Sequence, residues 1–472
     1  MNTTIAAVDL GATSGRVILG RLVDGVLHTE HITRFGNEPV HTLDGMHWNL
    51  LNLHRRVLAG LAAAERSAPG EIASVGIDSW AVDYALLHDG RVLGNPYHYR
   101  DARNDAGVRA VHDRIGAAEL YQRNGLQHLP FNTVFQLSTE GALLEFADQM
   151  LLIPDLFTFW LTGRAIAERT NASTTGLLDP RSLAWDLDLA DTLGIPSRIL
   201  PPLVDPGTPV GVLTPQAAAA VGRALPIVTV GSHDTASAVA AIPNTGRDFA
   251  YISCGTWGLV GLELDGPVLT EHARQANFTN EGGLDETNRF LHNVMGLWLL
   301  SESLRHWEPA ATDARRASAL AELLDAAAKV DEPLAIFDVN DPIFLPPGDI
   351  PHRVETWCRD HDQPVPRSRP VLIRAIIESL AEAFAHAVHD AARLADHEVT
   401  TIHIVGGGSQ NTLLCQATAN RSGLPVVAGP VEATAMGNML VQARALGALG
   451  PDLRDIRAVA AASSNLTRYL PR

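Results

Sequence analysis

The alternation of apolar and polar positions at the start of the chain predicts strands joined by tight turns. Residues 5–35 read as a strand, a glycine-containing turn, a second strand, an Asp24-Gly25 turn and a third strand. Asp-Gly between two apolar runs is a strong hairpin signal, because both residues accept positive φ. Residues 71–94 repeat this pattern, with two strands and a second Asp-Gly turn at Asp89-Gly90.

Helical periodicity appears between and after these strands. One face of a helix is formed by apolar residues that precede the second strand region: Leu50, Leu53, Val57, Leu58 and Leu61. Residues 116–225 read as mostly helical, and a short helix follows Asp234 and ends near Pro243. Residues 369–397 give the longest amphipathic helix. A mixed sheet with helical crossovers predicts the α/β class.

An internal echo predicts two similar domains. Residues 6–20, "AAVDLGATSGRVILG", and residues 250–264, "AYISCGTWGLVGLEL", share one plan: an apolar strand, a glycine-containing turn and a returning apolar strand. Two copies of one unit in a chain indicate duplicated domains. The predicted boundary lies near residue 244, which gives domains of residues 1–243 and 244–472.

Length, charge and cysteine content narrow the class of protein. A chain of 472 residues is too long for one core, and its net charge of −17 argues against binding to a nucleic acid backbone. Only three cysteines occur, which favours a reducing compartment over a disulfide framework. The start lacks the basic region of a signal peptide, and no apolar run reaches the roughly 18 residues of a membrane helix. We therefore expect a cytoplasmic protein with no nucleic acid and no membrane partner. The sequence does not indicate an oligomeric state.

Three glycine-containing turns are candidate phosphate or nucleotide sites. In "DLGATSGR", residues 9–16, backbone N–H groups can converge on an anion, although a plain hairpin turn explains the segment equally well. In "SCGTW", residues 253–257, Thr256 could donate to a phosphate, but a turn is the more common explanation. In "VGGGSQN", residues 405–411, three consecutive glycines favour the close approach of a ligand such as a base or ribose. The P-loop pattern is absent from the chain.

The segment "VGSHDTASAV", residues 230–239, raises a different question. Asp234 is a carboxylate among small and apolar residues, and such a group is costly to bury unless it is satisfied. On the residues alone, the favoured explanation is an N-cap for the short helix that follows. A carboxylate at a helix N-terminus is also kept ionised by the helix dipole, as a general base requires, so both roles stay open.

Many stretches, in order along nearly the whole chain, carry a resemblance to a known family. They are "VDLGATSGRV", "SVGIDSWAVDY", "YRDAR", "LPFNTVFQL", "IPDLFTFWLTG", "TNASTTGLLD", "SHDTASAV", "YISCGTWGLVG", "NEGG", "NVMGLWLL", "IHIVGGGSQNTLL" and "AGPVEATAMGN". With them the chain resembles the FGGY family of carbohydrate kinases. The resemblance implies two actin-like ATPase (ribonuclease H-like) domains that face each other across a catalytic cleft, with ATP as co-substrate and Mg²⁺ as cofactor.

The resemblance also implies roles for particular residues. Asp234 would be the general base, and Asp9 would hold Mg²⁺, usually through water. The expected ATP contacts are Ala12, Thr13, Ser14, Gly15, Arg16, Thr256, Ser301 and Gly407. The expected sugar contacts are Ala81, His233, Asp234, Thr235 and Asn293.

Two of these positions depart from the branch of the family that the chain most resembles, which acts on L-rhamnulose. Ala81 stands where a sugar-contacting glycine is usual, and its methyl could narrow the pocket. Ser301 stands where a nucleotide-contacting glutamine is usual, and serine is shorter. The implied reaction is phosphorylation of L-rhamnulose at its 1-hydroxyl. A kinase for another small ketose, such as L-fuculose, and a catalytically inactive sensor of sugar or nucleotide stay open.

Overall fold

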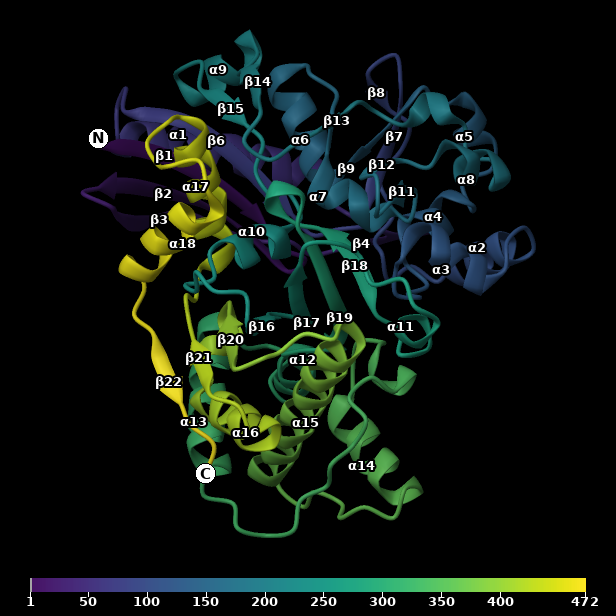
Figure 1. Ribbon diagram of the computed structural model, residues 1–472, viewed down its shortest axis with the longest axis vertical. Helices are drawn as coiled ribbons and strands as arrows, with labels where there is room; N and C mark the ends of the chain where they lie inside the picture. Colours follow the sequence, from purple (N-terminus) through teal and green to yellow (C-terminus); the bar gives the residue numbers. More distant parts are fainter. Residues whose placement is uncertain (1) are drawn as a thin grey trace. The chain divides into compact units, whose positions relative to one another are not determined.

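The computed structural model describes residues 2–472. These residues form two compact units (Figure 1). The first unit contains the chain up to Thr245 together with Glu263–Phe290 and Glu432–Ser464. The second unit contains Gly246–Leu262, Leu291–Val431 and Asn465–Arg472. A late segment of the chain therefore completes the first unit. The domain division at residues 243 and 244 stays a prediction.

A mixed sheet of six strands is the framework of the first unit. Its order is β14-β15-β6-β1-β2-β3. The strands are β14 (Pro209–Val212), β15 (Pro226–Val228), β6 (Ile72–Ser79), β1 (Thr3–Leu10), β2 (Ser14–Val23) and β3 (Val26–Gly36). β1, β2 and β3 are consecutive antiparallel strands, and β6 pairs with β1 in parallel. The predicted Asp-Gly turn between β2 and β3 is confirmed, because Asp24 and Gly25 have φ values of 50° and 78°.

Helices and short strands complete the first unit. Its helices are α1 (Leu50–Ser67), α2 (Asn104–His112), α3 (Ala117–Asn124), α4 (Thr133–Leu137), α5 (Ala142–Phe146), α6 (Ile153–Thr162), α7 (Arg169–Ala172), α8 (Leu187–Thr192), α9 (Pro215–Val221), α10 (Asp234–Ala240), α11 (Glu271–Gln275), α17 (Ala433–Ala445) and α18 (Leu453–Ala462). Its shorter strands are β4 (Val40–Thr42), β5 (Gly45–His47), β7 (Tyr84–His88), β8 (Arg91–Val92), β9 (Gln149–Leu152), β10 (Ala167–Glu168), β11 (Leu178–Asp179), β12 (Ala184–Trp185), β13 (Leu203–Val204) and β18 (Thr279–Gly282). The region predicted as mostly helical thus also contains short strands. Strands of two to four residues have too few positions to show a period.

The alternation of side chains along β1 divides them between two cores. Ala6, Val8 and Leu10 pack with residues of α1, α6 and α9 on one face of the sheet. Ile5 and Ala7 pack with residues of α10, α17 and α18 on the other face. Figure 1 shows α17 and α18, drawn in yellow, beside these purple strands. Because successive side chains of a strand point to opposite faces, Asp9 lies on the same face as Ile5 and Ala7.

The second unit is built on another mixed sheet. Its strands have the order β19-β17-β16-β20-β21-β22, and the first three residues of β19 belong to the first unit. The strands are β16 (Phe249–Cys254), β17 (Trp257–Leu264), β19 (Asn288–Met295), β20 (Thr401–Val405), β21 (Val426–Ala428) and β22 (Thr467–Tyr469). The helices are α12 (Trp298–Trp307), α13 (Asp313–Ala327), α14 (Ile350–Asp360), α15 (Arg369–Ala395) and α16 (Thr412–Ser422). The predicted longest helix is α15.

The internal echo in the sequence is confirmed as a repeat in topology. β1 pairs antiparallel with β2 and parallel with β6, and β16 pairs antiparallel with β17 and parallel with β20. Each copy thus has a hairpin and one parallel neighbour, and the α/β class is confirmed. Within residues 2–472, no helix is long and apolar enough to cross a membrane.

Candidate active site

An ion pair lies at the end of the first hairpin. Asp9 and Arg16 are direct partners in the β1–β2 ladder, and Arg16 Nε donates to Asp9 Oδ2 at 2.9 Å. Arg16 Nη1 lies 2.8 Å from Oε2 of Glu432, the residue before α17. One guanidinium therefore joins the first hairpin to a residue more than four hundred positions later in the chain.

A second carboxylate stands beside this pair. Asp78 on β6 is the parallel partner of Asp9, and it is fully buried. Its Oδ2 accepts from Asn438 Nδ2 at 2.5 Å, whereas its Oδ1 has no hydrogen-bond partner among the described residues. Sequence reasoning missed Asp78. The available signal was that two neighbouring strands, "IAAVDL" and "IASVGIDS", both carry an aspartate at the carboxyl end.

These carboxylates act on one another electrostatically. Burial raises the pKa of Asp9, against the effect of Arg16, and the charge of Asp234 raises it further. Burial also raises the pKa of Asp78 well above its usual range, with further contributions from Asp9 and Asp234. A positive charge placed among these three groups would favour their ionised forms.

The arrangement fits a magnesium ion that keeps most of its water. Among residues 2–472, no three His, Cys, Asp or Glu side chains are grouped closely enough to hold a metal ion by themselves. Mg²⁺ is usually bound through one or two carboxylates, with water and phosphate oxygens as its other ligands. The buried, unpartnered Oδ1 of Asp78 is an oxygen of the required kind.

Asp234 is the first residue of α10 and not its N-cap. The N-cap is His233, and no side chain caps this helix, so the capping expectation is wrong. His233 is kept extended because it bridges Ser79 in parallel and its N–H faces Thr170 Oγ1 at 3.4 Å. The side chain of Asp234 is 31% exposed. Its Oδ1 accepts from Thr235 Oγ1 at 3.2 Å.

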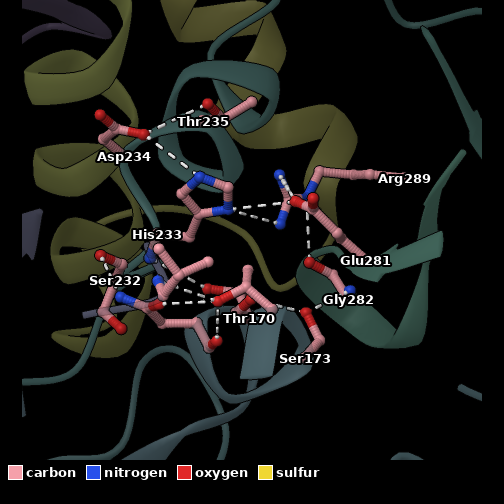
Figure 2. A network of polar contacts seen from close by, with 12 residues as sticks. Thr170, Ser173, Ser232, His233, Asp234, Thr235, Glu281, Gly282 and Arg289 are labelled. Carbon is pink, nitrogen blue, oxygen red and sulfur yellow. Dashed lines mark hydrogen bonds and ion pairs between the residues drawn. The ribbon is translucent and has the colours of Figure 1, made fainter. Parts of the chain in front are cut away.

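His233 lies between Asp234 and a buried ion pair, as Figure 2 shows. Its Nε2 is 3.4 Å from Asp234 Oδ1. On the other side of the ring, Nδ1 is 3.1 Å from Arg289 Nη2 and 3.2 Å from Glu281 Oε2. Burial acts to raise the pKa of Glu281, but Arg289 and His233 outweigh it and lower the pKa. Neither Glu281 nor Arg289 was predicted.

A buried carboxylate fixes the backbone just before His233. Glu168 Oε2 accepts from the Ser232 N–H at 2.9 Å and from Ser232 Oγ at 2.7 Å. The same oxygen accepts from Thr170 Oγ1 at 2.5 Å. Glu168 is fully buried, and it was not predicted either. These hydrogen bonds therefore fix the backbone of the segment that carries His233 and Asp234.

The segment that contains Ala81 passes next to this one. The Ser79 N–H donates to the Ser232 carbonyl at 2.9 Å. Val82 then has a φ of 66°, and the Asp83 N–H donates back to the Ala81 carbonyl at 2.8 Å. Four groups donate to the Asp83 carboxylate: Trp48 Nε1, Trp80 Nε1, the Tyr99 N–H and Gln136 Nε2. Burial nevertheless raises the pKa of Asp83 to about 6.

The first glycine-containing turn is a tight hairpin in which glycine is not required by a positive φ. Neither Gly11 nor Gly15 has a positive φ. A Cβ on Gly15 would lie 2.3 Å from Phe35 Cε2, so this position is glycine because of packing. The Gly11 N–H donates to the Ser14 carbonyl at 2.9 Å. Among the predicted phosphate contacts of this turn, Thr13 is exposed and Gly15 is buried. The others are half-buried: Ala12, Ser14 and Arg16.

In the second unit, two of the predicted nucleotide contacts, Thr256 and Gly407, follow the carboxyl ends of the neighbouring parallel strands β16 and β20. Thr256 is in the turn after β16, and the Leu297 N–H just before α12 donates to the Gly255 carbonyl of that turn at 2.9 Å. Ser301 is exposed on α12. A Cβ on Gly408 would lie 2.3 Å from Cys254 Sγ, whereas one on Gly407 would meet nothing within 4 Å. Gly408 is thus explained by packing, and Gly407 is open to a ligand. Asn293 lies on β19.

The structure therefore groups the predicted residues by unit. The first unit brings together Asp9, Arg16, His233, Asp234 and Thr235, with Ala81 on the adjoining segment. The second contains Thr256, Ser301 and Gly407. The residues that sequence reasoning missed all belong to the first unit: Asp78, Glu168, Glu281, Arg289 and Glu432.

Comparison with known families matches both parts of the chain. The model of the FGGY family of carbohydrate kinases, N-terminal domain, matches residues 4–241. The model of the C-terminal domain of the same family matches residues 250–446.

Similar proteins of full length are known. A rhamnulokinase of Bacteroides thetaiotaomicron is 38% identical over 478 residues, covering 100% of this chain and 96% of the relative. A rhamnulokinase of Pectobacterium carotovorum is 42% identical over 476 residues, covering 99% of this chain and 93% of the relative. A solved structure of ligand-bound xylulose kinase from Lactobacillus acidophilus gives a TM-score of 0.78 at 19% identity, covering 100% of this chain and 94% of the other. At that identity the likeness establishes the fold alone.

Proposed function

Because the chain belongs to the FGGY family of carbohydrate kinases, we propose that it transfers a phosphoryl group from ATP to the 1-hydroxyl of L-rhamnulose. The products are L-rhamnulose 1-phosphate and ADP, and the reaction belongs to L-rhamnose catabolism. The observation that carries the proposal is the Asp234 carboxylate, which is accessible to solvent and stands among the residues that the family places around its substrates. Relatives named rhamnulokinase, 38% and 42% identical over nearly all of the chain, support the choice of sugar.

Asp234 is the proposed general base. As the sugar oxygen forms its bond to the γ-phosphorus, the bond from that phosphorus to the bridging oxygen of ADP breaks, and the hydroxyl proton passes to Asp234. A positioned base of this kind contributes about 10² to 10⁴ in rate. The rest of catalysis is alignment and neutralisation of charge, because phosphoryl transfer needs little covalent help from a protein.

Asp9 and Asp78 are the proposed holders of Mg²⁺, which neutralises and orients the triphosphate when it is bound. Arg16 and the turn from Ala12 to Gly15 would contact the phosphates. From the second unit, Thr256 would contact phosphate, while Ser301 and Gly407 would line the nucleotide site. The buried, unpartnered oxygen of Asp78 supports the metal part of this assignment.

The proposed sugar contacts are His233 and Thr235 beside the base, Ala81 on the neighbouring turn and Asn293 on β19. With these roles, residues 1–243 form a domain with the sugar site, the first phosphate turn and the base. Residues 244–472 form a domain with the second phosphate turn and the adenosine site. The cytoplasm, where ATP is made available, is the proposed compartment, and three buried free cysteines suit it.

Asp234→Asn tests the assignment of the base. This variant should bind ATP and L-rhamnulose with near-normal affinity by calorimetry but lose about 10² to 10⁴ of its kcat. Asp452→Asn is the matched control, because Asp452 is an exposed carboxylate at the start of α18 and should leave kcat unchanged. A near-normal kcat in Asp234→Asn would reject the role.

A panel of ketoses tests the sugar. L-Rhamnulose, L-fuculose and D-xylulose would be compared by kcat/KM in a coupled assay for ADP. L-Rhamnulose is expected to give the highest value, and a better value for another ketose would replace the sugar but keep the kinase. If no sugar were phosphorylated, the chain would instead be a sensor of sugar or nucleotide.

A further inference from the structure

A fully buried arginine lies behind the His233 ring. Arg289 is the second residue of β19 and is 0% exposed. Its Nε donates to the Gly282 carbonyl at 2.9 Å, its Nη1 lies 3.2 Å from Glu281 Oε2, and its Nη2 lies 3.1 Å from His233 Nδ1 (Figure 2). A buried ion pair is weak evidence for stability, because desolvation of the two charges can exceed their attraction. The effect of this ion pair on His233 therefore says more about its role than its contribution to stability does.

The chemistry of arginine bears on where the proton of His233 lies. A guanidinium group only donates hydrogen bonds and keeps its charge, so a hydrogen bond between Arg289 Nη2 and His233 Nδ1 requires Nδ1 to be the acceptor. In a neutral imidazole that accepts at Nδ1, the proton is on Nε2. Nε2 is the ring atom 3.4 Å from Asp234 Oδ1. The N–H group of His233 thus faces the side of the ring where the candidate base lies.

Because Glu281 also lies beside His233, a proton on Nε2 of that ring requires Arg289. Its Oε2 is 3.2 Å from His233 Nδ1, and a carboxylate alone at that position would favour a proton on Nδ1. Arg289 lies 3.2 Å from the same oxygen and neutralises it. Without the guanidinium, Glu281 would draw the proton to the wrong ring nitrogen.

The ion pair and the imidazole ring are attached to one frame. The Gly282 N–H donates to Ser173 Oγ at 2.8 Å, and Ser173 Oγ donates to the Thr170 carbonyl at 2.7 Å. Thr170 in turn faces the His233 N–H through its own Oγ1 at 3.4 Å. Both sides of the His233–Arg289 contact are therefore fixed to the same buried turn.

We propose that Arg289 and Glu281 are positioning residues that hold His233 as its Nε2–H tautomer. The N–H is then offered to the oxygen of the acceptor sugar, which leaves the proton of that hydroxyl directed at Asp234. The identity of that oxygen rests on the proposed function, whereas the tautomer is a property of the protein alone and is measured without substrate.

Three variants of the ion pair separate positioning from stability. Arg289→Met removes the guanidinium, so Glu281 should draw a proton onto Nδ1. Glu281→Gln leaves Arg289 as the donor to Nδ1, so the tautomer should persist even if stability falls. In the double variant, which combines both substitutions, the new side-chain amide at position 281 can donate to Nδ1 and should restore the Nε2–H tautomer. Arg457→Met is the matched control, because Arg457 is also buried in an ion pair, with its Nη2 2.7 Å from Glu263 Oε2.

The first readout is the ¹⁵N chemical shift of the two ring nitrogens in protein labelled at histidine. The His233 signals are identified by their loss in His233→Gln. The proposal expects an unprotonated Nδ1 in the wild type, in Glu281→Gln, in the double variant and in Arg457→Met, and a protonated Nδ1 in Arg289→Met. An unprotonated Nδ1 in Arg289→Met, or a protonated one in the wild type, would overturn it.

The second readout is kinetic. A loss of donor alignment in Arg289→Met should lower kcat/KM for the sugar by about 100-fold and leave the KM for ATP unchanged. The double variant should recover most of that loss. If Arg289→Met lost no more than Arg457→Met, or if the double variant did not recover, the positioning role would be wrong. If the shifts came out as expected but the wild type phosphorylated no sugar, the proposed function would fail and the proton assignment would stand.

Discussion

The backbone at Val82 holds strain that a pair of substitutions can measure. Its φ of 66° puts a β-branched residue in the left-handed region, inside a turn closed by the bond from the Asp83 N–H to the Ala81 carbonyl. That region costs an L-residue about 1 to 2 kcal/mol. Such strain persists only where the surroundings fix the backbone, and here the Thr133 hydroxyl donates to the Val82 carbonyl at 2.6 Å while Asp83 is held by four donors.

The perturbation is the comparison of Val82→Ala with Val82→Gly. Alanine keeps the Cβ and with it the strain, whereas glycine relieves about 1 to 2 kcal/mol but loses about 0.5 to 1 kcal/mol through the entropy of the unfolded chain. At Val75, a buried residue of β6 without positive φ, the same pair should favour alanine by about 0.5 to 1 kcal/mol. Subtracting the alanine–glycine difference in the free energy of unfolding at Val75 from that at Val82 isolates the strain, because the cost of the lost methyl groups is similar at both positions and largely cancels. We expect about 1 to 2 kcal/mol.

Urea unfolding followed by tryptophan fluorescence gives the free energies of unfolding of the four variants. Trp80 and Trp48, whose rings lie 4.1 Å apart next to this turn, report on it directly. The slopes with urea should agree among the variants, because the surface exposed on unfolding is the same. If glycine and alanine differed at Val82 just as they do at Val75, the turn would carry no strain and this reasoning would be refuted.

Three further predictions concern the pocket, the metal and the pH dependence. Ala81→Gly removes the methyl group of a proposed sugar contact. If that methyl group narrows the pocket, kcat/KM for a bulkier ketose relative to L-rhamnulose should rise about tenfold, the value of one methyl group; an unchanged ratio would place Ala81 outside the pocket. Asp78→Asn removes one of the proposed Mg²⁺ holders, so the Mg²⁺ concentration for half-maximal activity should rise at least about tenfold, as a titration of activity with MgCl₂ would measure. Asp83 has its pKa raised from 3.8 to about 6, so its folded form binds more protons than its unfolded form between these values, and its contribution to stability is lost as the pH rises through that range. The free energy of unfolding relative to Asp83→Asn should therefore fall by about 2 kcal/mol from pH 4.5 to pH 7, and a rise would show that the four donors lower the pKa instead.

Local signals in the sequence predicted the parts of the fold that depend on few residues. The Asp-Gly turns at Asp24 and Asp89 were found because two adjacent residues suffice to set a hairpin. The repeat of β1–β2 in β16–β17 was found because each copy is a strand, a glycine turn and a strand in immediate succession. Short strands and the return of residues 432–464 to the first unit were not predicted, because no local pattern encodes them.

In the candidate site as well, the residues with a local sequence signal were predicted and those without one were not. Asp9 and Asp234 stand in short stretches that resemble a family, so they could be singled out from the sequence. Glu281 and Arg289 lie about fifty residues from His233 in the chain, and only the folded structure brings their side chains to its ring. The N-cap expectation for Asp234 failed because His233, held extended by its pairing with Ser79, takes the cap position, so the helix starts one residue earlier than the local pattern favours.

The buried charges of the first unit make more sense as preorganisation than as stabilisation. Glu168 and Arg289 are fully buried, and well-packed apolar side chains in their place would often be neutral or stabilising. Both residues act on the segment from Ser232 to Asp234, one through its backbone and the other through the His233 ring. Donors and acceptors fixed in advance do not have to reorganise when charge develops in a transition state. The cost of burying Glu168 and Arg289 is thus met when the protein folds, before substrate arrives, and Asp234, the proposed base, remains the partly exposed carboxylate of that segment.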